Sequence, residues 1–385
     1  MTGRMFSFAV AIVAASSTLF ADPFPTEKPA IIRVAAGDKI ADGDQFITQT
    51  RQLTYDGKRS GEGYFSLDGS LLTLQSEREP ENPWYQIYVL NLDTGDSERV
   101  SPGTGKTTCS YINPANSQQV IFASTHGDPK SVELQKAELE FRASGKERRY
   151  SWDYDPHFDI YRYDRDTKAL TQLTKEEGYD AECAYSRDGK TIVFSSNRAA
   201  FTKSLTPEES KIREMTPEYF ADLYLMDADG KNVRQITDTP GYDGGPFFSY
   251  DEKFIVWRRF SAKGETADVY LADADGKNQR RVTDFGAMSW APFLHPTNEY
   301  IIFASNKEGF SNFELYLVDR EGKKEPVRVT YTDGFDGLPV FAPDGKSLVW
   351  TTNRKGTSQL FTARWNHEAA MEALAKAPAR AANHI

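Results

Sequence analysis

A short sequence phrase recurs six times along the chain, and this repetition restricts the possible folds more than any other feature. Each copy consists of an apolar residue, a small or polar residue and a tight turn, as in Tyr185-Ser186-Arg187-Asp188-Gly189. Where nothing is inserted, successive copies lie about 46 residues apart. The repetition predicts an array of equivalent structural units. The turn position is occupied in order by Asp68, Ala115, Asp188, Asp251, Thr297 and Asp344.

Each unit carries the pattern of four short strands. An apolar run follows the turn, as in 300–305, and a strand of alternating apolar residues comes next, as in 314–319. In two of the units an Asp-Gly hairpin, at 229–230 and 275–276, then leads into a short fourth strand. Four antiparallel strands per unit, repeated six times, predict an all-β fold, a six-bladed β-propeller. Two longer intervals indicate insertions between second and third strands, at 128–155 and 199–220.

The two ends of the repeated region are expected to meet. The last unit has no fourth strand, whereas a matching segment, 50–54, precedes the first unit. An N-terminal strand that completes the last blade would remove the open sheet edges. The Ala-rich segment that follows the last unit, from residue 367, predicts a short C-terminal helix. We therefore expect a signal peptide at 1–21, a lead-in at 22–46, the propeller at 47–366 and a helical tail at 367–385.

The N-terminal segment is typical of a secretory signal peptide. Arg4 precedes an apolar run that ends in small residues at Ala21, and this run is too short for a transmembrane helix. We expect cleavage near Ala21, a periplasmic or secreted protein, and no transmembrane segment in the mature chain. The net charge of −10, with mixed acids and bases, disfavours a nucleic-acid partner. We expect a monomer.

The repeat resembles the exported TolB-like β-propellers, most clearly in 185–198 and 222–230. The resemblance extends over about Thr50 to Asn366 and implies a propeller of the WD40-like type. The segment 22–49 is too short for the N-terminal α/β domain of TolB, so the resemblance does not imply the role of TolB in an envelope complex. Similar propellers accompany peptidases, and some resemble metal-dependent oligogalacturonate lyases.

Acidic residues recur at equivalent positions of the units. Asp180, Asp243 and Asp336 lie eight residues before their turns, and Glu62 and Glu182 lie two residues later in the repeat. Equivalent positions of innermost strands face one channel, so these carboxylates are expected to converge at its mouth. They would bind Ca²⁺, Mg²⁺ or a cationic ligand group. The alternative is that each Asp caps its own loop through backbone amides.

A second candidate site lies in the first insertion, where Asp153, Asp155 and His157 alternate along the chain. In an extended segment they would share one face and hold a metal ion; the alternative is a polar role within the blade. We expect Cys109 and Cys183 to be unpaired, buried thiols. The chain has no Gly-x-Ser-x-Gly motif, which disfavours serine hydrolase chemistry.

These features favour an exported binding or scaffold protein that presents its channel mouth and inserted loops to a protein, peptide or envelope partner. One alternative is a metal-assisted lyase or hydrolase that acts on a polysaccharide or peptide at the channel mouth, with the carboxylates as general acid and base. Another is a non-catalytic partner of a separate peptidase. The sequence itself identifies no catalytic residue.

Overall fold

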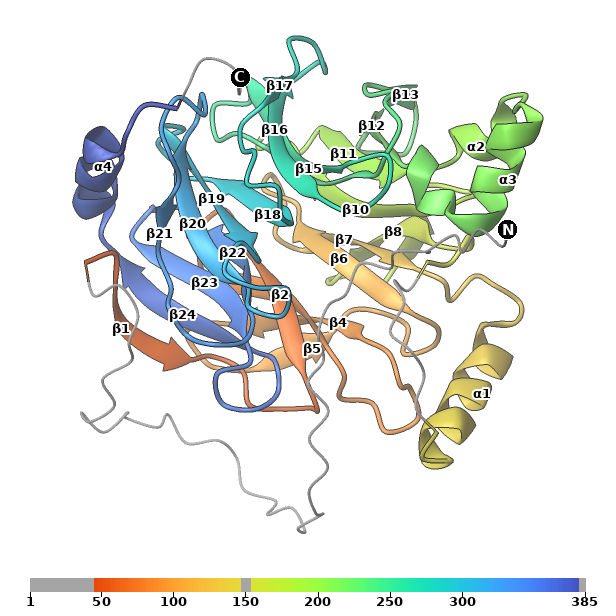
Figure 1. Cartoon of the computed structure of the whole chain (residues 1–385). Helices are drawn as coiled ribbons and strands as arrows, with labels where there is room; N and C mark the ends of the chain where they lie inside the picture. Colours follow the sequence, from red (N-terminus) through yellow and green to blue (C-terminus); the bar gives the residue numbers. More distant parts are fainter. Residues whose placement is uncertain (1–44, 147–153, 381–385) are drawn as a thin grey trace.

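The computed structural model describes residues 45–146 and 154–380 and forms a six-bladed β-propeller (Figure 1). Six four-stranded antiparallel sheets surround a central channel, and the first strand of each blade contacts the first strand of a neighbouring blade. The predicted fold class is therefore confirmed. The predicted signal peptide, 1–21, lies outside the described residues.

The first five blades each use four consecutive strands. Blade 1 contains β2 (Ser60–Phe65), β3 (Leu71–Ser76), β4 (Gln86–Asn91) and β5 (Ser97–Arg99). Blade 2 contains β6 (Thr107–Ile112), β7 (Gln119–Ser124), β8 (Asp159–Asp164) and β9 (Leu170–Gln172). Blade 3 contains β10 (Asp180–Tyr185), β11 (Thr191–Ser196), β12 (Asp222–Asp227) and β13 (Arg234–Gln235). Blade 4 contains β14 (Asp243–Phe248), β15 (Phe254–Phe260), β16 (Ala267–Asp273) and β17 (Arg280–Arg281). Blade 5 contains β18 (Ser289–Leu294), β19 (Tyr300–Ser305), β20 (Glu314–Asp319) and β21 (Val327–Arg328).

Blade 6 joins the two ends of the propeller, as predicted. It contains β22 (Asp336–Phe341), β23 (Ser347–Thr352) and β24 (Gln359–Trp365), and its outer strand is β1 (Ile47–Gln52). The β1 strand is antiparallel to β24. The buried ring of Phe46 stacks on Trp365 with centroids 6.1 Å apart. Apolar burial therefore reinforces the backbone closure.

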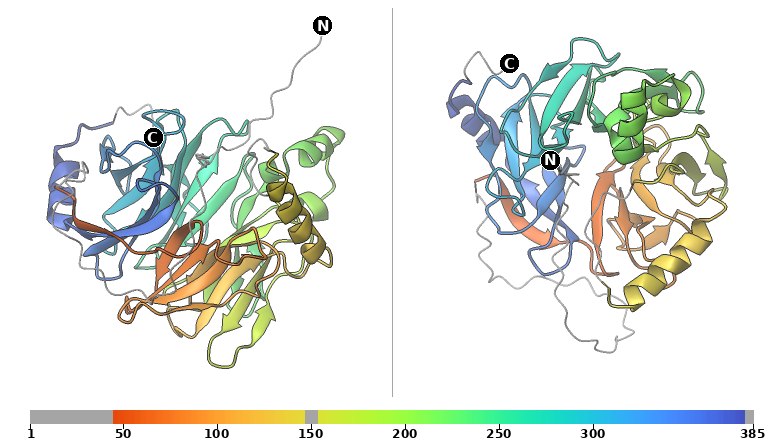
Figure 2. Two further views of the ribbon diagram at one scale, coloured as in Figure 1. Left: turned by 90° about the horizontal axis from the view of Figure 1, so that it is seen from below. Right: turned by 45° about the vertical axis from the view of Figure 1, so that its right-hand side comes forward.

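Helices occupy the insertions and the C-terminal segment. The α1 helix (Ser131–Ala143) lies between β7 and β8, whereas α2 (Ala199–Thr202), α3 (Pro207–Met215) and the 3-10 turn Pro217–Phe220 lie between β11 and β12. Figures 1 and 2 place α1 and α3 at one edge of the molecule and α4 (His367–Lys376) at the opposite edge. Within the described ranges, no helix is long and apolar enough to cross a membrane.

Candidate functional site

The first strand of every blade carries a β-bulge at the same place. The pairing register shifts there in all six blades, and the residue at the shift adopts a positive φ between 48° and 61°. This conformation is strained for residues other than glycine, and bulges redirect the side chain that they carry. All six bulged residues line one cavity at the channel mouth. They are Glu62, Cys109, Glu182, Gly245, Ala291 and Leu338.

This cavity, which we call the mouth cavity, has a volume of about 590 Å³ and two unlike sides. Blades 1 to 4 contribute most of its ionisable groups, including Glu62, Glu182 and Arg258. Blades 5 and 6 contribute apolar groups, including Trp290 and Leu338. A ligand with both a polar and an apolar part would match these two sides.

Aromatic side chains close the channel below the bulged residues. The Tyr64 ring lies 5.6 Å from Tyr111 and 5.2 Å from Phe247, and Phe247 lies 5.1 Å from Phe293. These four residues each lie two positions after a bulged residue, so the repeat itself generates the layer. The mouth cavity is therefore a blind recess with an aromatic floor.

Glu182 is held in the mouth cavity by donors from blade 4. Its carboxylate accepts hydrogen bonds from the Gly245 backbone N–H at 2.6 Å and from Arg258 Nη2 at 2.6 Å. Arg258 also donates to the Tyr242 hydroxyl at 3.1 Å. The Nε of Arg258 is buried and has no hydrogen-bond partner among the residues that the structure describes.

Glu62 lies in a different electrostatic environment from Glu182. Burial raises the pKa of Glu62, and the charge of Glu182 adds to this effect, although hydrogen bonds from Cys109 and Tyr64 oppose it. The Tyr64 hydroxyl donates to Glu62 at 3.0 Å. Burial and the two nearby carboxylates also raise the pKa of Cys109 well above its ordinary value, so its thiol stays protonated. Both cysteines are free; Cys183 is buried and Cys109 is partly exposed.

The structure separates the three predicted aspartates from the two glutamates. Asp180, Asp243 and Asp336 are fully buried at the starts of their strands and do not line the mouth cavity. Each carboxylate instead forms an ion pair within its own blade. The pairs are Asp180–Arg198 at 2.5 Å, Asp243–Arg259 at 2.6 Å and Asp336–Arg354 at 2.9 Å.

The arginine partners carry a sequence signal that could have revealed these pairs. An arginine follows each of the three aspartates by 16 or 18 residues, within the second strand or two residues after its end. Residues that face each other on adjacent antiparallel strands have neighbouring side chains. This spacing therefore brings the aspartate and the arginine together. The alternative that each aspartate caps its own loop gave these residues a structural role, but it named backbone amides rather than an arginine as the partner.

Two of the three residues of the second candidate site, Asp155 and His157, belong to the described part of the chain. Asp153 lies outside the described residues. Asp155 is buried and lies 3.3 Å from Lys106 Nζ, whereas the His157 side chain is exposed. The His157 backbone N–H, not its imidazole, donates a hydrogen bond to the Asp155 carboxylate at 3.1 Å. Within 45–146 and 154–380, no three His, Cys, Asp or Glu residues are placed to hold one metal ion.

Comparison with known proteins finds one matching family model and several similar solved structures. The family model described as the TolB β-propeller domain matches residues 208–378. A solved structure from Agrobacterium tumefaciens, assigned as TolB, has a TM-score of 0.54 at 19% identity, and the match covers 82% of this chain and 94% of that one. TolB from Acinetobacter baumannii has a TM-score of 0.51 at 15% identity, with 80% of this chain and 64% of that chain covered.

A third similar structure is that of an enzyme. The oligogalacturonate lyase from Vibrio parahaemolyticus has a TM-score of 0.50 at 14% identity, and the match covers 83% of this chain and 94% of that one. At such identities the similarity of these solved structures shows the fold alone.

Proposed function

We propose, from the premise that this chain is a TolB-like β-propeller protein, that it is an exported binding protein whose mouth cavity holds a segment of a protein or peptide partner. One observation carries the proposal: the aromatic floor turns the channel into a blind recess of about 590 Å³, open at the mouth. Concave sites that combine apolar walls with a few placed polar groups are typical of ligand binding.

The first insertion supports this proposal because it forms part of the cavity wall. Glu138 and Arg142 of α1 line the mouth cavity. Arg142 lies 2.9 Å from Glu77 of blade 1, so the helix is attached to the neighbouring blade by a charged contact. Long loops on a rigid scaffold often determine partner choice. We therefore expect α1 to contribute to specificity.

The test is to fill the cavity without changing the rest of the surface. A Leu338→Trp variant places a large ring into the mouth cavity, whereas Leu170→Trp adds the same ring to an exposed position on β9. Envelope extract is passed over the wild-type protein and both variants. We expect Leu338→Trp alone to lose the captured partner while its unfolding midpoint stays near that of the wild type. Equal capture by all three proteins would contradict the proposal.

Export requires its own test. Full-length protein is expressed in a Gram-negative host, and the periplasmic and cytoplasmic fractions are analysed by mass spectrometry. We expect a chain that begins at Asp22 in the periplasmic fraction. An uncleaved chain confined to the cytoplasm would contradict export. If the captured partner proves to be a peptidase, the protein would be its non-catalytic companion.

A second candidate function, acid–base catalysis, is favoured by the contrast between Glu62 and Glu182. Burial raises the pKa of Glu62, which favours its protonated form, while Glu182 accepts hydrogen bonds from Arg258 and the Gly245 N–H. Two carboxyl groups in unlike environments can serve as acid and base.

This candidate is tested by incubation with oligogalacturonate and other polysaccharide fragments. If catalysis occurs, Glu62→Gln and Glu182→Gln should each lower the rate by about 100-fold or more. The exposed control Glu265→Gln should leave it unchanged. If Glu265→Gln lost as much activity as the two cavity variants, the loss would be due to impaired folding and not to the carboxylates of the cavity.

A further inference from the structure

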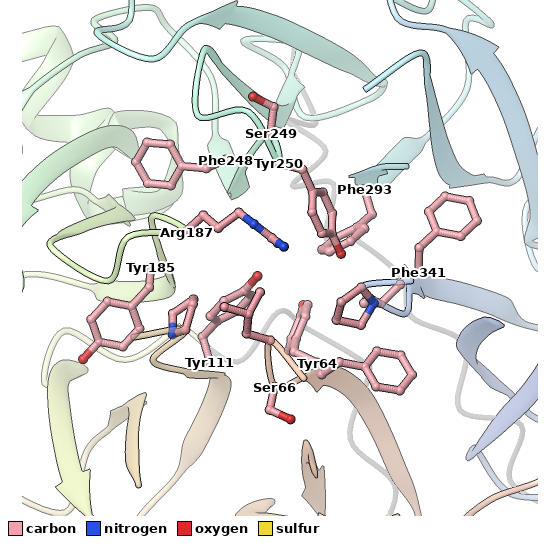
Figure 3. Close-up of a pocket in the computed structure, with 15 residues that line it drawn as sticks. Tyr64, Ser66, Tyr111, Tyr185, Arg187, Phe248, Ser249, Tyr250, Phe293 and Phe341 are labelled. Carbon is pink, nitrogen blue, oxygen red and sulfur yellow. The ribbon is translucent and has the colours of Figure 1, made fainter. Parts of the chain in front are cut away.

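The opposite end of the channel has a different chemistry. Beyond the aromatic floor, the turns of the blades surround a small cavity of about 40 Å³. Figure 3 shows the Arg187 guanidinium pointing to the centre of this cavity, with the hydroxyl groups of Tyr111 and Tyr250 near the guanidinium. The Arg187 guanidinium lies 4.6 Å from the centroid of the Tyr250 ring. We call this end the turn-side cavity.

Arg187 differs from the arginines of the mouth cavity in its partners. Arg59, Arg142 and Arg258 each have a carboxylate within 3.0 Å. Among the residues that the structure describes, none forms a hydrogen bond or an ion pair with Arg187, although Arg187 is half-buried. A guanidinium held over an aromatic ring and without an anion is a ready donor for a carboxylate.

The acidic residues of the surrounding turns do not supply that anion. Asp68 and Asp188 accept hydrogen bonds from Ser66 Oγ at 2.6 Å and Ser186 Oγ at 2.7 Å. Asp344 accepts from the Lys346 backbone N–H at 2.9 Å. These carboxylates are thus oriented by their own turns.

A crevice of about 500 Å³ continues from the turn-side cavity, between blades 1 and 6. Arg187, Leu67 and Pro343 line both spaces. A second arginine, Arg51, also lines the crevice, and it forms no ion pair with the residues that the structure describes. The crevice wall therefore carries two arginines together with the carboxylates of Asp68 and Asp344.

The remaining wall alternates apolar and polar groups. Its apolar residues are Leu53, Phe65, Leu67, Leu92, Ala342, Pro343 and Val349, and its polar ones include Asp68, Asp344, Ser347 and Thr362. A hydrocarbon tail would leave the polar groups without partners, at a cost in free energy. A peptide satisfies both kinds of group, because its side chains are apolar and its backbone forms hydrogen bonds.

We propose that the turn-side cavity and its crevice bind the C-terminal end of a peptide with apolar last residues, with the terminal carboxylate on Arg187. This site lies on the face opposite the mouth cavity, and the aromatic layer separates the two. It goes beyond the proposed function, which concerns only the mouth.

The test compares acetyl-leucyl-leucyl-valine as a free acid with the same peptide as a C-terminal amide. Ligand-observed NMR titrations against the full mature chain give both dissociation constants. We expect the free acid to bind about 10- to 100-fold more tightly, because a charge-assisted pair is lost in the amide. Arg187→Met should remove this difference, and Arg187→Lys should restore part of it.

Three controls separate the alternatives. Arg234→Met removes an exposed arginine of β13 and should leave binding unchanged. Glu182→Gln alters the mouth cavity and should likewise have no effect. Decanoate tests a lipid-like ligand: tighter binding of decanoate than of the peptide acid would overturn the peptide assignment. Equal affinities of acid and amide, or no binding of either peptide at millimolar concentration, would overturn the site itself.

Discussion

The buried pair of Asp243 and Arg259 makes the sharpest prediction about the carboxylates of the repeat. The Asp243 side chain is fully buried, and Arg259 contacts it through Nε at 2.6 Å and Nη2 at 2.7 Å. An Asp243→Ala substitution removes the acceptor of both hydrogen bonds and leaves the charge of Arg259, whose side chain is only 11% exposed, without its carboxylate. The variant therefore tests whether this residue stabilises the blade or serves a ligand.

The expected loss follows from the geometry. Breaking one side of a buried ion pair costs about 3–5 kcal/mol, since the remaining charge is uncompensated. Arg259 retains a contact with the Gln279 side chain at 3.0 Å, so we expect the lower value, about 3 kcal/mol. For a chain of 385 residues such a loss corresponds to a fall of roughly 4 °C in the unfolding midpoint.

Thermal and urea unfolding of the full chain measure this change. The control Asp238→Ala removes an exposed carboxylate that lies 3.9 Å from Lys203, and it should cost less than about 1 kcal/mol. The double variant Asp243→Ala/Arg259→Met should recover part of the loss, because it leaves no unpaired charge.

Two results would refute this reasoning. One is a loss in Asp243→Ala that does not exceed that of Asp238→Ala. The other is a rise in the wild-type midpoint on addition of Ca²⁺ or Mg²⁺ after EDTA treatment that Asp243→Ala abolishes, since a cation that stabilises the fold must bind the folded state. The second result would return the aspartates to a cation site.

Two further predictions concern stability. Burial lowers the pKa of His295 to about 4, whereas the unfolded chain has a His pKa of about 6.5. The free energy of unfolding is therefore unaffected by this group above pH 6.5 and falls by up to about 3 kcal/mol as the pH falls toward 4. His295→Asn should flatten this dependence in urea unfolding measured across that range; an unchanged slope would contradict it. Phe46→Ala should cost about 3 kcal/mol by weakening the closure of blade 6, whereas exposed Tyr55→Ala should cost little; equal thermal midpoints would contradict the closure argument.

The amino-acid sequence by itself determined the architecture. The turn residues and the alternation of apolar side chains are local properties, and they recur often enough to specify six units of four strands. The missing last strand and its match at 50–54 also predicted the pairing of β1 with β24. Both insertions occur where the spacing placed them, between second and third strands.

The tertiary structure alone decided which acidic residues are available to a ligand. Equivalent spacing placed Asp243 and Glu182 near one channel mouth, but it did not distinguish an ion-paired side chain from one that lines a cavity. That difference depends on the bulge in each first strand, which turns Glu62 and Glu182 into the mouth cavity while leaving Asp243 against Arg259. A one-residue shift of register scarcely alters the polar and apolar pattern, yet it reverses the direction in which a side chain points.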